Sequence, residues 1–320
     1  MNYSDYLIFR IVRWKASMLN LFYKGVTPWA IANKRQIITN RVLGRLANYI
    51  YPIYCKLNNI DINRTVLTNG LEKKVIVSLT SFPERIDKVY LTINTLLRQS
   101  VLPNKIILWL AKSQFKDPGY IPKNLSSLEG NLFEIRYCED LKSYKKIFYT
   151  AQEYYDDIIV TVDDDTLYPE NWLENLIKTY LDYPDCVCCY RAHKIVSKSG
   201  KTLPYMQWLG LSPDQKGPDF SLIPIGVGGI LYPPYFFENV DFDYRKISEL
   251  CPTSDDLWLK ALAILNGYKA VKVFQNSKEW FTITSSQKVS LNDTNVRNSA
   301  NDEAISKLQR YYKINLYGNG

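Results

Sequence analysis

Three consecutive aspartates, Asp163, Asp164 and Asp165, follow a run of five β-branched, mostly apolar residues at positions 158–162. Such a run is typical of a buried strand. Adjacent carboxylates repel one another, and burying a lone carboxylate is strongly unfavourable. A divalent cation would relieve both problems, and oxygen ligands suit Mg²⁺ or Mn²⁺, which usually serve a substrate phosphate. The triplet therefore indicates a metal–phosphate site, with a solvated acidic turn as the alternative.

A second pair of carboxylates, Asp255 and Asp256, opens a predicted helix that runs to Asn266 and Gly267. Ser254 is a suitable N-cap for this helix, and a glycine is a typical stop signal. Carboxylates in a first helical turn are stabilised by the helix dipole. Capping alone is thus a sufficient explanation of the pair when it is taken by itself.

The chain that leads to the triplet alternates between strand-like and helix-like patterns from residue 74 onward. The predicted strands cover 75–79, 106–110, 133–137 and 158–162, and the predicted helices cover 85–99, 143–155 and 171–180. This alternation predicts an α/β fold with a parallel sheet and right-handed crossovers. Ligands collect at the carboxyl ends of such strands. Thr80, Ser81, Asp140 and the aspartate triplet follow three of these strands, so we expect them to converge.

Beyond residue 184 the alternation becomes irregular. Strands are predicted over 187–195, 227–232 and 271–274, and a last helix over 302–312. Residues 220–237 carry no charge, but their prolines and glycines argue against a membrane-spanning helix.

Positive charge is concentrated near the N-terminus. Residues 1–74 hold 12 Lys and Arg against 3 Asp and Glu, a net +9, so the rest of the chain carries −1 of the overall +8. The neutral main body argues against nucleic-acid binding. A helix is predicted over residues 3–24, with a stripe formed by Leu7, Ile11, Trp14, Met18 and Leu21.

Residues 35–57 repeat this basic amphipathic pattern, and Tyr51-Pro52 is predicted to end the second helix. The pattern predicts that residues 1–57 dock on an anionic membrane surface. The alternative is docking on the protein's own body or on a second subunit.

Six cysteines occur without Cys-x-x-Cys spacing, and the chain has a single histidine, which together argue against a zinc site. No disulfide framework is implied, which indicates a reducing compartment. Arg10, Arg13 and Lys15 interrupt the N-terminal apolar run, so no signal peptide is predicted. We therefore expect a cytoplasmic protein, peripheral at the inner face of the cell membrane.

Four motifs in combination resemble those of GT-A-fold glycosyltransferases of the bacterial kind that build capsule, lipopolysaccharide or other surface glycans. They are Val77-Ser78-Leu79-Thr80-Ser81-Phe82-Pro83 with Arg85, Ser143-Tyr144-Lys145-Lys146, Asp163-Asp164-Asp165, and Ser254-Asp255-Asp256. The resemblance implies a GT-A-like (Rossmann-like), mostly parallel central sheet flanked by helices. The expected domains are a basic helical arm over 1–72, a catalytic domain over 73–285 with donor half 73–183 and acceptor half 184–285, and a C-terminal loop and helix over 286–320.

The resemblance also implies roles on the donor side. Thr80 and Ser81 would hold the base and ribose of a nucleotide-sugar, with helix capping as the alternative explanation of their hydroxyls. Arg85 would lie within reach of phosphate. Asp140 would bind base or ribose.

Further donor roles fall on the lysine pair and the aspartate triplet. Lys145 or Lys146 would face the diphosphate, with a solvated helix face as the alternative. Asp165 is the first candidate for a direct ligand of Mn²⁺ or Mg²⁺. Asp163 would reach ribose or the metal through water, and Asp164 can point the other way.

On the acceptor side, the resemblance implies that a carboxylate at the start of the late helix is the general base of an inverting transfer. Asp256 is favoured slightly over Asp255. An acceptor would enter near Gly228 and Gly229. The aromatic candidates for stacking on sugar rings, which are more often core residues, are Trp208, Trp280, Tyr232 and Tyr235.

The chain departs from many metal-dependent members of this family because no histidine follows His193. His193 itself is best explained as a packed or hydrogen-bonded strand residue. Water, or a late residue such as Asp293, would then supply the third metal ligand.

The expected function is transfer of a sugar from a nucleotide-sugar, preferably a UDP-sugar, to a growing glycan or lipid-linked glycan. One alternative is a nucleotidyltransferase that makes a sugar-nucleotide, but that class usually needs a Gly-rich loop after the first strand, and residues 80–85 contain no glycine. The other alternative is a non-catalytic scaffold with the same fold, against which the intact acids argue.

Overall fold

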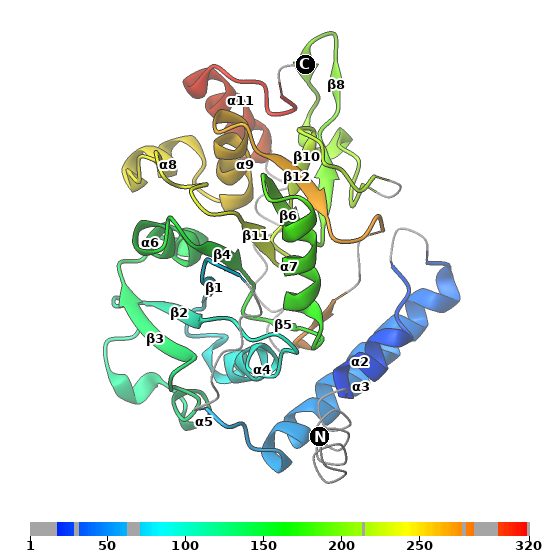
Figure 1. Cartoon of the computed structure of the whole chain (residues 1–320), viewed down its shortest axis with the longest axis vertical. Helices are drawn as coiled ribbons and strands as arrows, with labels where there is room; N and C mark the ends of the chain where they lie inside the picture. The colour runs from blue at the N-terminus through cyan, green and yellow to red at the C-terminus, as the bar shows by residue number, and fades with distance from the viewer. Residues whose placement is uncertain are drawn as a thin grey trace.

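The computed structural model describes residues 18–28, 32–62, 71–212, 215–276, 280–284 and 300–318. A seven-stranded sheet in the order β12-β6-β11-β4-β1-β2-β3 lies at its centre (Figure 1). The strands are β1 (Val75–Thr80), β2 (Lys105–Ala111), β3 (Phe133–Cys138), β4 (Ile158–Thr161), β6 (Cys186–Cys189), β11 (Ile230–Tyr232) and β12 (Lys269–Lys272).

The pairing of these strands is mostly parallel. β3, β2, β1 and β4 run parallel to one another, as do β6 and β12. β11 runs antiparallel between β4 and β6. The predicted α/β fold with a mostly parallel central sheet is therefore confirmed.

Helices cover both faces of the sheet (Figure 1). On one face, α4 (Ile86–Leu96) and α7 (Trp172–Asp182) pack against every second residue of β1, namely Val75, Val77 and Leu79. On the other face, α6 (Lys145–Glu153), α9 (Asp255–Leu265) and α11 (Ala300–Tyr312) pack against Ile159 and Val187. Because side chains alternate across a strand, the apolar runs of the sequence fill both cores.

The second half of the chain differs from the predicted pattern. Residues 187–195 form two strands in different sheets, β6 and β7 (Ala192–Lys194), and β7 pairs with β10 (Leu222–Pro224). The structure also contains α8 (Tyr244–Leu250) and a short antiparallel pair of β5 (Thr166–Leu167) with β13 (Phe281–Thr282). Strands of two residues are too short to show a hydrophobic period, so the sequence does not reveal them.

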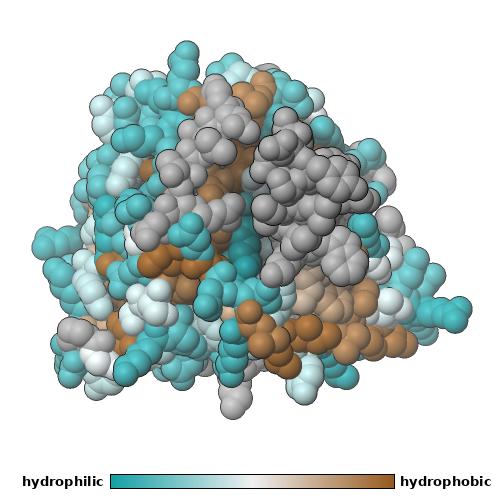
Figure 2. Space-filling view, turned by 60° about the horizontal axis from the view of Figure 1, so that its bottom comes forward, coloured by the Kyte–Doolittle hydropathy of each residue, from teal (hydrophilic) through white to brown (hydrophobic). Residues whose placement is uncertain are grey.

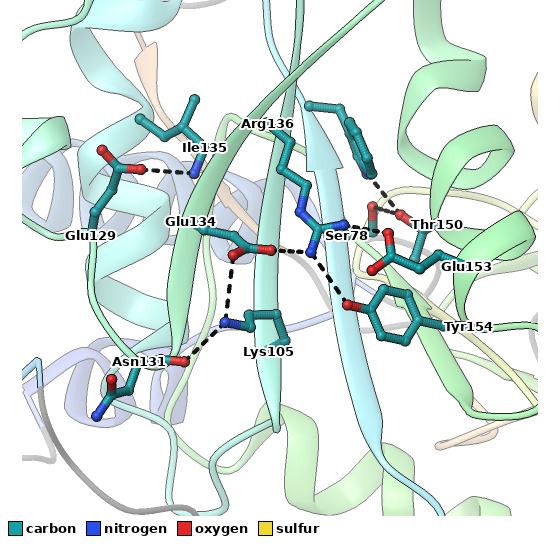
Figure 3. Close-up of polar contacts among 11 residues, drawn as sticks. Ser78, Lys105, Glu129, Asn131, Glu134, Ile135, Arg136, Thr150, Glu153 and Tyr154 are labelled. Carbon is teal, nitrogen blue, oxygen red and sulfur yellow. Dashed lines mark hydrogen bonds and ion pairs between the residues drawn. The ribbon is translucent and has the colours of Figure 1, made fainter.

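Charged side chains cover the edge strand β3 (Figure 3). Glu134 Oε2 lies 3.5 Å from Lys105 Nζ, and Glu134 Oε1 lies 2.5 Å from Arg136 Nη2. Arg136 also pairs with Glu153 of α6 and donates to the hydroxyl of Tyr154. Charges on an edge strand disfavour pairing with a strand of another molecule.

The arm consists, within the described residues, of α2 (Met18–Lys24) and α3 (Lys34–Leu57), which lie side by side at the lower right of Figure 1. Their inner side chains are buried against the body in one cluster of Leu19, Ala47, Tyr51, Leu91, Leu167, Phe281 and Ile283. The inner face of the arm thus docks on the protein's own body.

Part of the predicted stripe over residues 3–24 can be placed. Leu7, Ile11 and Trp14 lie outside the described residues, and Leu21 is 62% exposed, whereas its neighbour Leu19 is buried. Met18, another member of the stripe, packs against the body cluster. The face that α2 turns to the body therefore includes only part of the predicted stripe.

The predicted end of the second helix at Tyr51-Pro52 is wrong, because α3 continues through Pro52 to Leu57. A proline removes one backbone N–H from the helix. Tyr51 is buried against the body and Tyr54 is packed against the same cluster, so contacts on both sides of the proline hold the helix together. None of the helices in the described ranges is both long and apolar enough to cross a lipid bilayer.

Candidate functional site

The aspartate triplet lies at the carboxyl end of β4, and its middle member points inward. The carboxylate of Asp164 accepts hydrogen bonds from Ser81 Oγ at 2.5 Å and from Arg85 Nη1 at 2.8 Å. Thr92 Oγ1 donates to the Asp164 carbonyl at 2.8 Å. Asp164 is buried, and it ties the turn to the end of β1 and to α4. Both carboxylate oxygens of Asp164 are thus engaged within the protein, in keeping with the expectation that Asp164 can point the other way, and its contact with a nucleotide-sugar stays a prediction.

Arg85 lies between two members of the triplet. Its Nη1 is also 3.0 Å from Asp165 Oδ2. The Asp165 carbonyl accepts a hydrogen bond from Ile283 N at 2.7 Å, just after β13. Arg85 therefore offsets part of the negative charge of the turn, and its predicted contact with phosphate stays a prediction.

Three other predicted donor residues make contacts within the protein. Thr80 Oγ1 donates to the Trp109 carbonyl across the β1–β2 pair at 2.8 Å. Asp140, just after β3, accepts from Lys145 Nζ at 2.8 Å and from the Lys142 N–H at 3.0 Å. Partial burial raises the pKa of Asp140, but these hydrogen bonds outweigh burial and lower it. Contacts of these residues with a nucleotide stay a prediction.

Lys146 joins the two acidic motifs of the sequence. Its Nζ lies 3.5 Å from Asp163 Oδ1 and 3.3 Å from Asp255 Oδ2, and its side chain is almost fully buried. Burial lowers the pKa of Lys146, but the charges of Asp255, Asp163 and Asp256 outweigh burial and raise it. The ammonium group therefore stays charged at neutral pH. The sequence did not distinguish Lys145 from Lys146. In the structure only Lys146 of this pair contacts Asp163 and Asp255, whereas Lys145 pairs with Asp140.

Asp256 lies next to Asp163 across a single glycine. The Asp256 carboxylate accepts a hydrogen bond from Gly226 N at 3.2 Å. A Cβ placed on Gly226 would lie 3.6 Å from Oδ1 of Asp163 and 3.6 Å from Oδ1 of Asp256. The loop before β11 thus runs between the two motifs. Ser254 occupies the N-cap of α9, as predicted, although its side chain makes no capping hydrogen bond.

The surroundings of Asp256 give its carboxyl group the properties of a base at neutral pH. Burial is the largest influence and, together with the like charge of Asp255, raises the pKa of Asp256 to about 7. Lys146 and the Gly226 N–H act in the opposite direction. A group with a pKa near the working pH is best suited to accept a proton during catalysis.

A buried chain of hydrogen bonds that the sequence reasoning missed fixes the backbone of Lys146. Trp109 Nε1 donates to Thr150 Oγ1 at 2.8 Å, the hydroxyls of Thr150 and Ser78 share a hydrogen bond of 2.8 Å, and Ser78 Oγ donates to the Lys146 carbonyl (Figure 3). Ser78 is a polar residue in the otherwise apolar stretch 75–79 of β1. That interruption is the signal that could have identified it.

The donor set of the triplet fits a hard divalent cation. Asp163 and Asp165 present two carboxylates from one turn, and the side chain of Asp163 is the more exposed, at 27% against 12%. Mg²⁺ in particular is usually held by one or two carboxylates, together with water and substrate phosphate. The described part of the chain holds no group of three His, Cys, Asp or Glu that could cage a metal by itself. Asp293 lies outside the described residues.

The predicted acceptor residues have structural roles. Gly228 and Gly229 have φ of +95° and +92°, and a Cβ on either would come within 2.7 Å of the indole of Trp280 or Trp172. Trp208 is buried, and its Nε1 donates to the Leu203 carbonyl. These contacts explain the residue types without an acceptor, so the acceptor role stays a prediction.

The remaining aromatic candidates are poorly placed for stacking on a sugar. Tyr232 and Trp280 are buried in the two cores. Tyr235 is exposed, but its N–H donates to the Tyr155 carbonyl, which precedes β4 and so lies at the end of the sheet opposite the triplet. The sequence reasoning missed Tyr205, a half-buried residue near Asp256. Burial, followed by the charge of Asp256, raises the pKa of Tyr205 to about 12.

His193 lies in β7, as predicted, and its Nδ1 accepts a hydrogen bond from Leu211 N at 2.9 Å. Burial is the main cause that lowers the pKa of His193 to about 4. The residue is thus a neutral, hydrogen-bonded strand histidine.

Comparison with known proteins identifies the fold. No protein-family model matches the chain, and no curated protein matches it in sequence. A mannosyltransferase from Pyrobaculum calidifontis, solved in complex with GDP-mannose and Mn²⁺, is similar over 83% of this chain and 72% of its own, with 14% identity and a TM-score of 0.50. A 4-diphosphocytidyl-2C-methyl-D-erythritol synthase is similar over 71% of this chain and 98% of its own, with 11% identity and a TM-score of 0.39. At 14% identity the first likeness shows the fold alone, which is GT-A-like and Rossmann-like. The second structure is too distant to indicate a function.

Replacing Ser78 with alanine tests the buried chain behind Lys146. Ser78→Ala removes the hydrogen bonds of Ser78 to the Thr150 hydroxyl and to the Lys146 carbonyl, so we expect the free energy of unfolding to fall by about 1–3 kcal/mol in urea denaturation. Ser197→Ala on the exposed strand β8 (Ser197–Lys198) is the control and should change stability by less than about 0.5 kcal/mol. Equal stability of the two variants would contradict the proposed support of Lys146.

Proposed function

We propose that this protein is a glycosyltransferase of the hexosyltransferase type that moves a sugar from a nucleotide-sugar to a growing bacterial surface glycan. A UDP-sugar is the first candidate for the donor, and the transfer inverts the anomeric carbon. The observation that carries the proposal is the meeting of two acidic motifs at Lys146, with Asp163 at 3.5 Å and Asp255 at 3.3 Å. One motif follows a strand of a GT-A-like sheet, and the other begins a late helix. Such a transfer needs both a site for the leaving diphosphate and a base for the acceptor.

On the donor side, Asp163 and Asp165 would hold a divalent cation, Mn²⁺ or Mg²⁺, and Lys146 would lie beside the diphosphate. The cation, when bound, neutralises the charge of the leaving nucleoside diphosphate. The likeness to a mannosyltransferase that binds GDP-mannose and Mn²⁺ supports this assignment. Base and ribose would lie at the ends of β1 and β3, near Thr80, Ser81 and Asp140.

On the acceptor side, Asp256 would accept the proton of the attacking hydroxyl. The hydroxyl oxygen then bonds to the anomeric carbon, while the bond from that carbon to the diphosphate oxygen breaks on the opposite face. Asp255 is held by Lys146 and acts on Asp256 through its charge. The raised pKa of Asp256 and the half-buried Tyr205 nearby support this half of the site.

The acceptor would be a glycan of capsule or lipopolysaccharide type, lipid-linked at the inner face of the cell membrane. Residues 1–57 would bring the enzyme to that anionic surface. The net charge of +9 in residues 1–74 supports this placement.

A panel of nucleotide-sugars tests the donor and the metal together. We expect one of them to be hydrolysed slowly to a nucleoside diphosphate in Mn²⁺, and a chelator to abolish this hydrolysis. Asp163→Asn and Asp165→Asn should each raise the Mn²⁺ concentration needed by about tenfold or more, and Asp185→Asn in an exposed turn is the control. Full hydrolysis in chelator would contradict the metal role, and release of pyrophosphate from a nucleoside triphosphate would indicate a nucleotidyltransferase.

Replacement of Asp256 tests the base. Asp256→Asn should lower the rate of transfer by about 10²- to 10⁴-fold and leave the affinity for the donor, measured by calorimetry, nearly unchanged. Asp255→Asn is the matched control and should retain most of the rate at high pH. If Asp256→Asn transfers sugar at the full rate, the base lies elsewhere.

The pH profile tests the origin of the shifted pKa. Because the base must be deprotonated, the rate should fall about tenfold for each pH unit below about 7. Asp255→Asn removes the like charge that raises the pKa of Asp256, so the acid limb should move to lower pH. A limb that stays in place or moves to higher pH would show that Asp255 does not act on the base.

A further inference from the structure

The outer face of α3 carries a continuous exposed apolar stripe. Its members follow one another at spacings of three or four residues, which places them on one side of the helix. They are Ile38, Val42, Leu46, Tyr49, Ile53 and Leu57, with 43–78% of each side chain exposed. Figure 2 shows the corresponding hydrophobic band along the lower right of the molecule. We call this set the α3 stripe.

The opposite face of α3 is fixed to the body, so the α3 stripe cannot turn inward. Asn40, Ala47 and Tyr51 are buried on that face. Asn40 also exchanges hydrogen bonds with the backbone of Thr27, and Asn48 Nδ2 donates to the Thr282 carbonyl at 3.0 Å. The stripe is therefore a surface of the folded protein.

Exposed cations border the α3 stripe. They are Lys34, Arg35, Arg41, Arg45 and Lys56, and α3 contains no Asp or Glu. Leu21 and Lys24 of the adjacent α2 are exposed as well. An apolar stripe with cations beside it matches a surface that is apolar inside and anionic outside. A second copy of this helix would instead bring two sets of the same cations together.

We infer that the α3 stripe is the face by which the protein lies on an anionic lipid bilayer. The apolar side chains enter the boundary between headgroups and acyl chains, and Arg41 and Arg45 pair with anionic headgroups. From Ile38 to Leu57 the stripe extends for about 28 Å parallel to the bilayer surface. This inference names the face that would contact the membrane in the proposed function. It rests on that function only for the reason why the protein would be at a membrane.

Sedimentation with vesicles tests the inference on the full chain, without any nucleotide-sugar. The unmodified protein should bind vesicles of phosphatidylcholine with 30% phosphatidylglycerol, and bind phosphatidylcholine vesicles much more weakly. Leu46→Ser with Ile53→Ser should lower the partition coefficient on anionic vesicles by about tenfold or more. The matched control is Leu181→Ser with Leu265→Ser, which changes two helix residues of similar exposure and should bind as the unmodified protein does.

The charge contribution has its own variant. Arg41→Gln with Arg45→Gln should weaken binding to anionic vesicles at low salt, and the difference should shrink as salt rises. The inference is overturned if the stripe variant binds anionic vesicles as well as its control. It is also overturned if removal of residues 1–17 alone abolishes binding, or if the stripe variant only converts a dimer to a monomer.

Failure of this inference and failure of the proposed function can be told apart. The stripe variant should hydrolyse the donor in solution at the unmodified rate, because α3 contributes none of the proposed catalytic or donor-binding residues. A protein that binds anionic vesicles through the α3 stripe but acts on no nucleotide-sugar would contradict the glycosyltransferase proposal and leave this inference standing.

Discussion

The charge balance around Lys146 is the constraint on which the candidate site depends. Asp163, Asp255 and Asp256 meet near its ammonium group, and without that group they would repel one another in a partly buried setting. Arg85 does the same for the other two members of the aspartate triplet. These two cations leave the five carboxylates with an excess of negative charge. Under the proposed function, a divalent cation would offset this charge as the anionic diphosphate binds, which is why the two belong to one proposal.

The sheet supports this balance through backbone contacts. Ser78 from β1 donates to the carbonyl of Lys146, and Thr150 one turn later joins the same buried chain. The backbone of Lys146 is therefore held in place, although the lysine side chain is long and flexible. Fixed groups of this kind need little reorganisation when charge develops during a reaction, which is the advantage of a preorganised site.

The sequence predicted the fold better than it predicted the direction of single side chains. Alternation of apolar runs is enough to place acidic residues at strand ends, because parallel strands share one ligand-binding edge. It does not say which side chain turns inward, since that depends on partners far along the chain, such as Ser81 for Asp164. For the same reason it could not separate Lys145 from Lys146. The late two-residue strands also escaped prediction because they carry no period.

The arm is connected to the aspartate turn as well as to a surface. Tyr23 of α2 donates to the Leu167 carbonyl of β5 at 2.5 Å and accepts from the Phe281 N–H of β13 at 2.9 Å. The Asn48 side chain bonds the backbone on both sides of Ile283, whose N–H in turn donates to the Asp165 carbonyl. Only α3 itself and the short strand β13 would therefore lie between a bilayer bound on the outer face of α3 and the turn that carries Asp165. Through these hydrogen bonds the same helix would set the height of the site above the lipid and hold one side of the turn that carries Asp165.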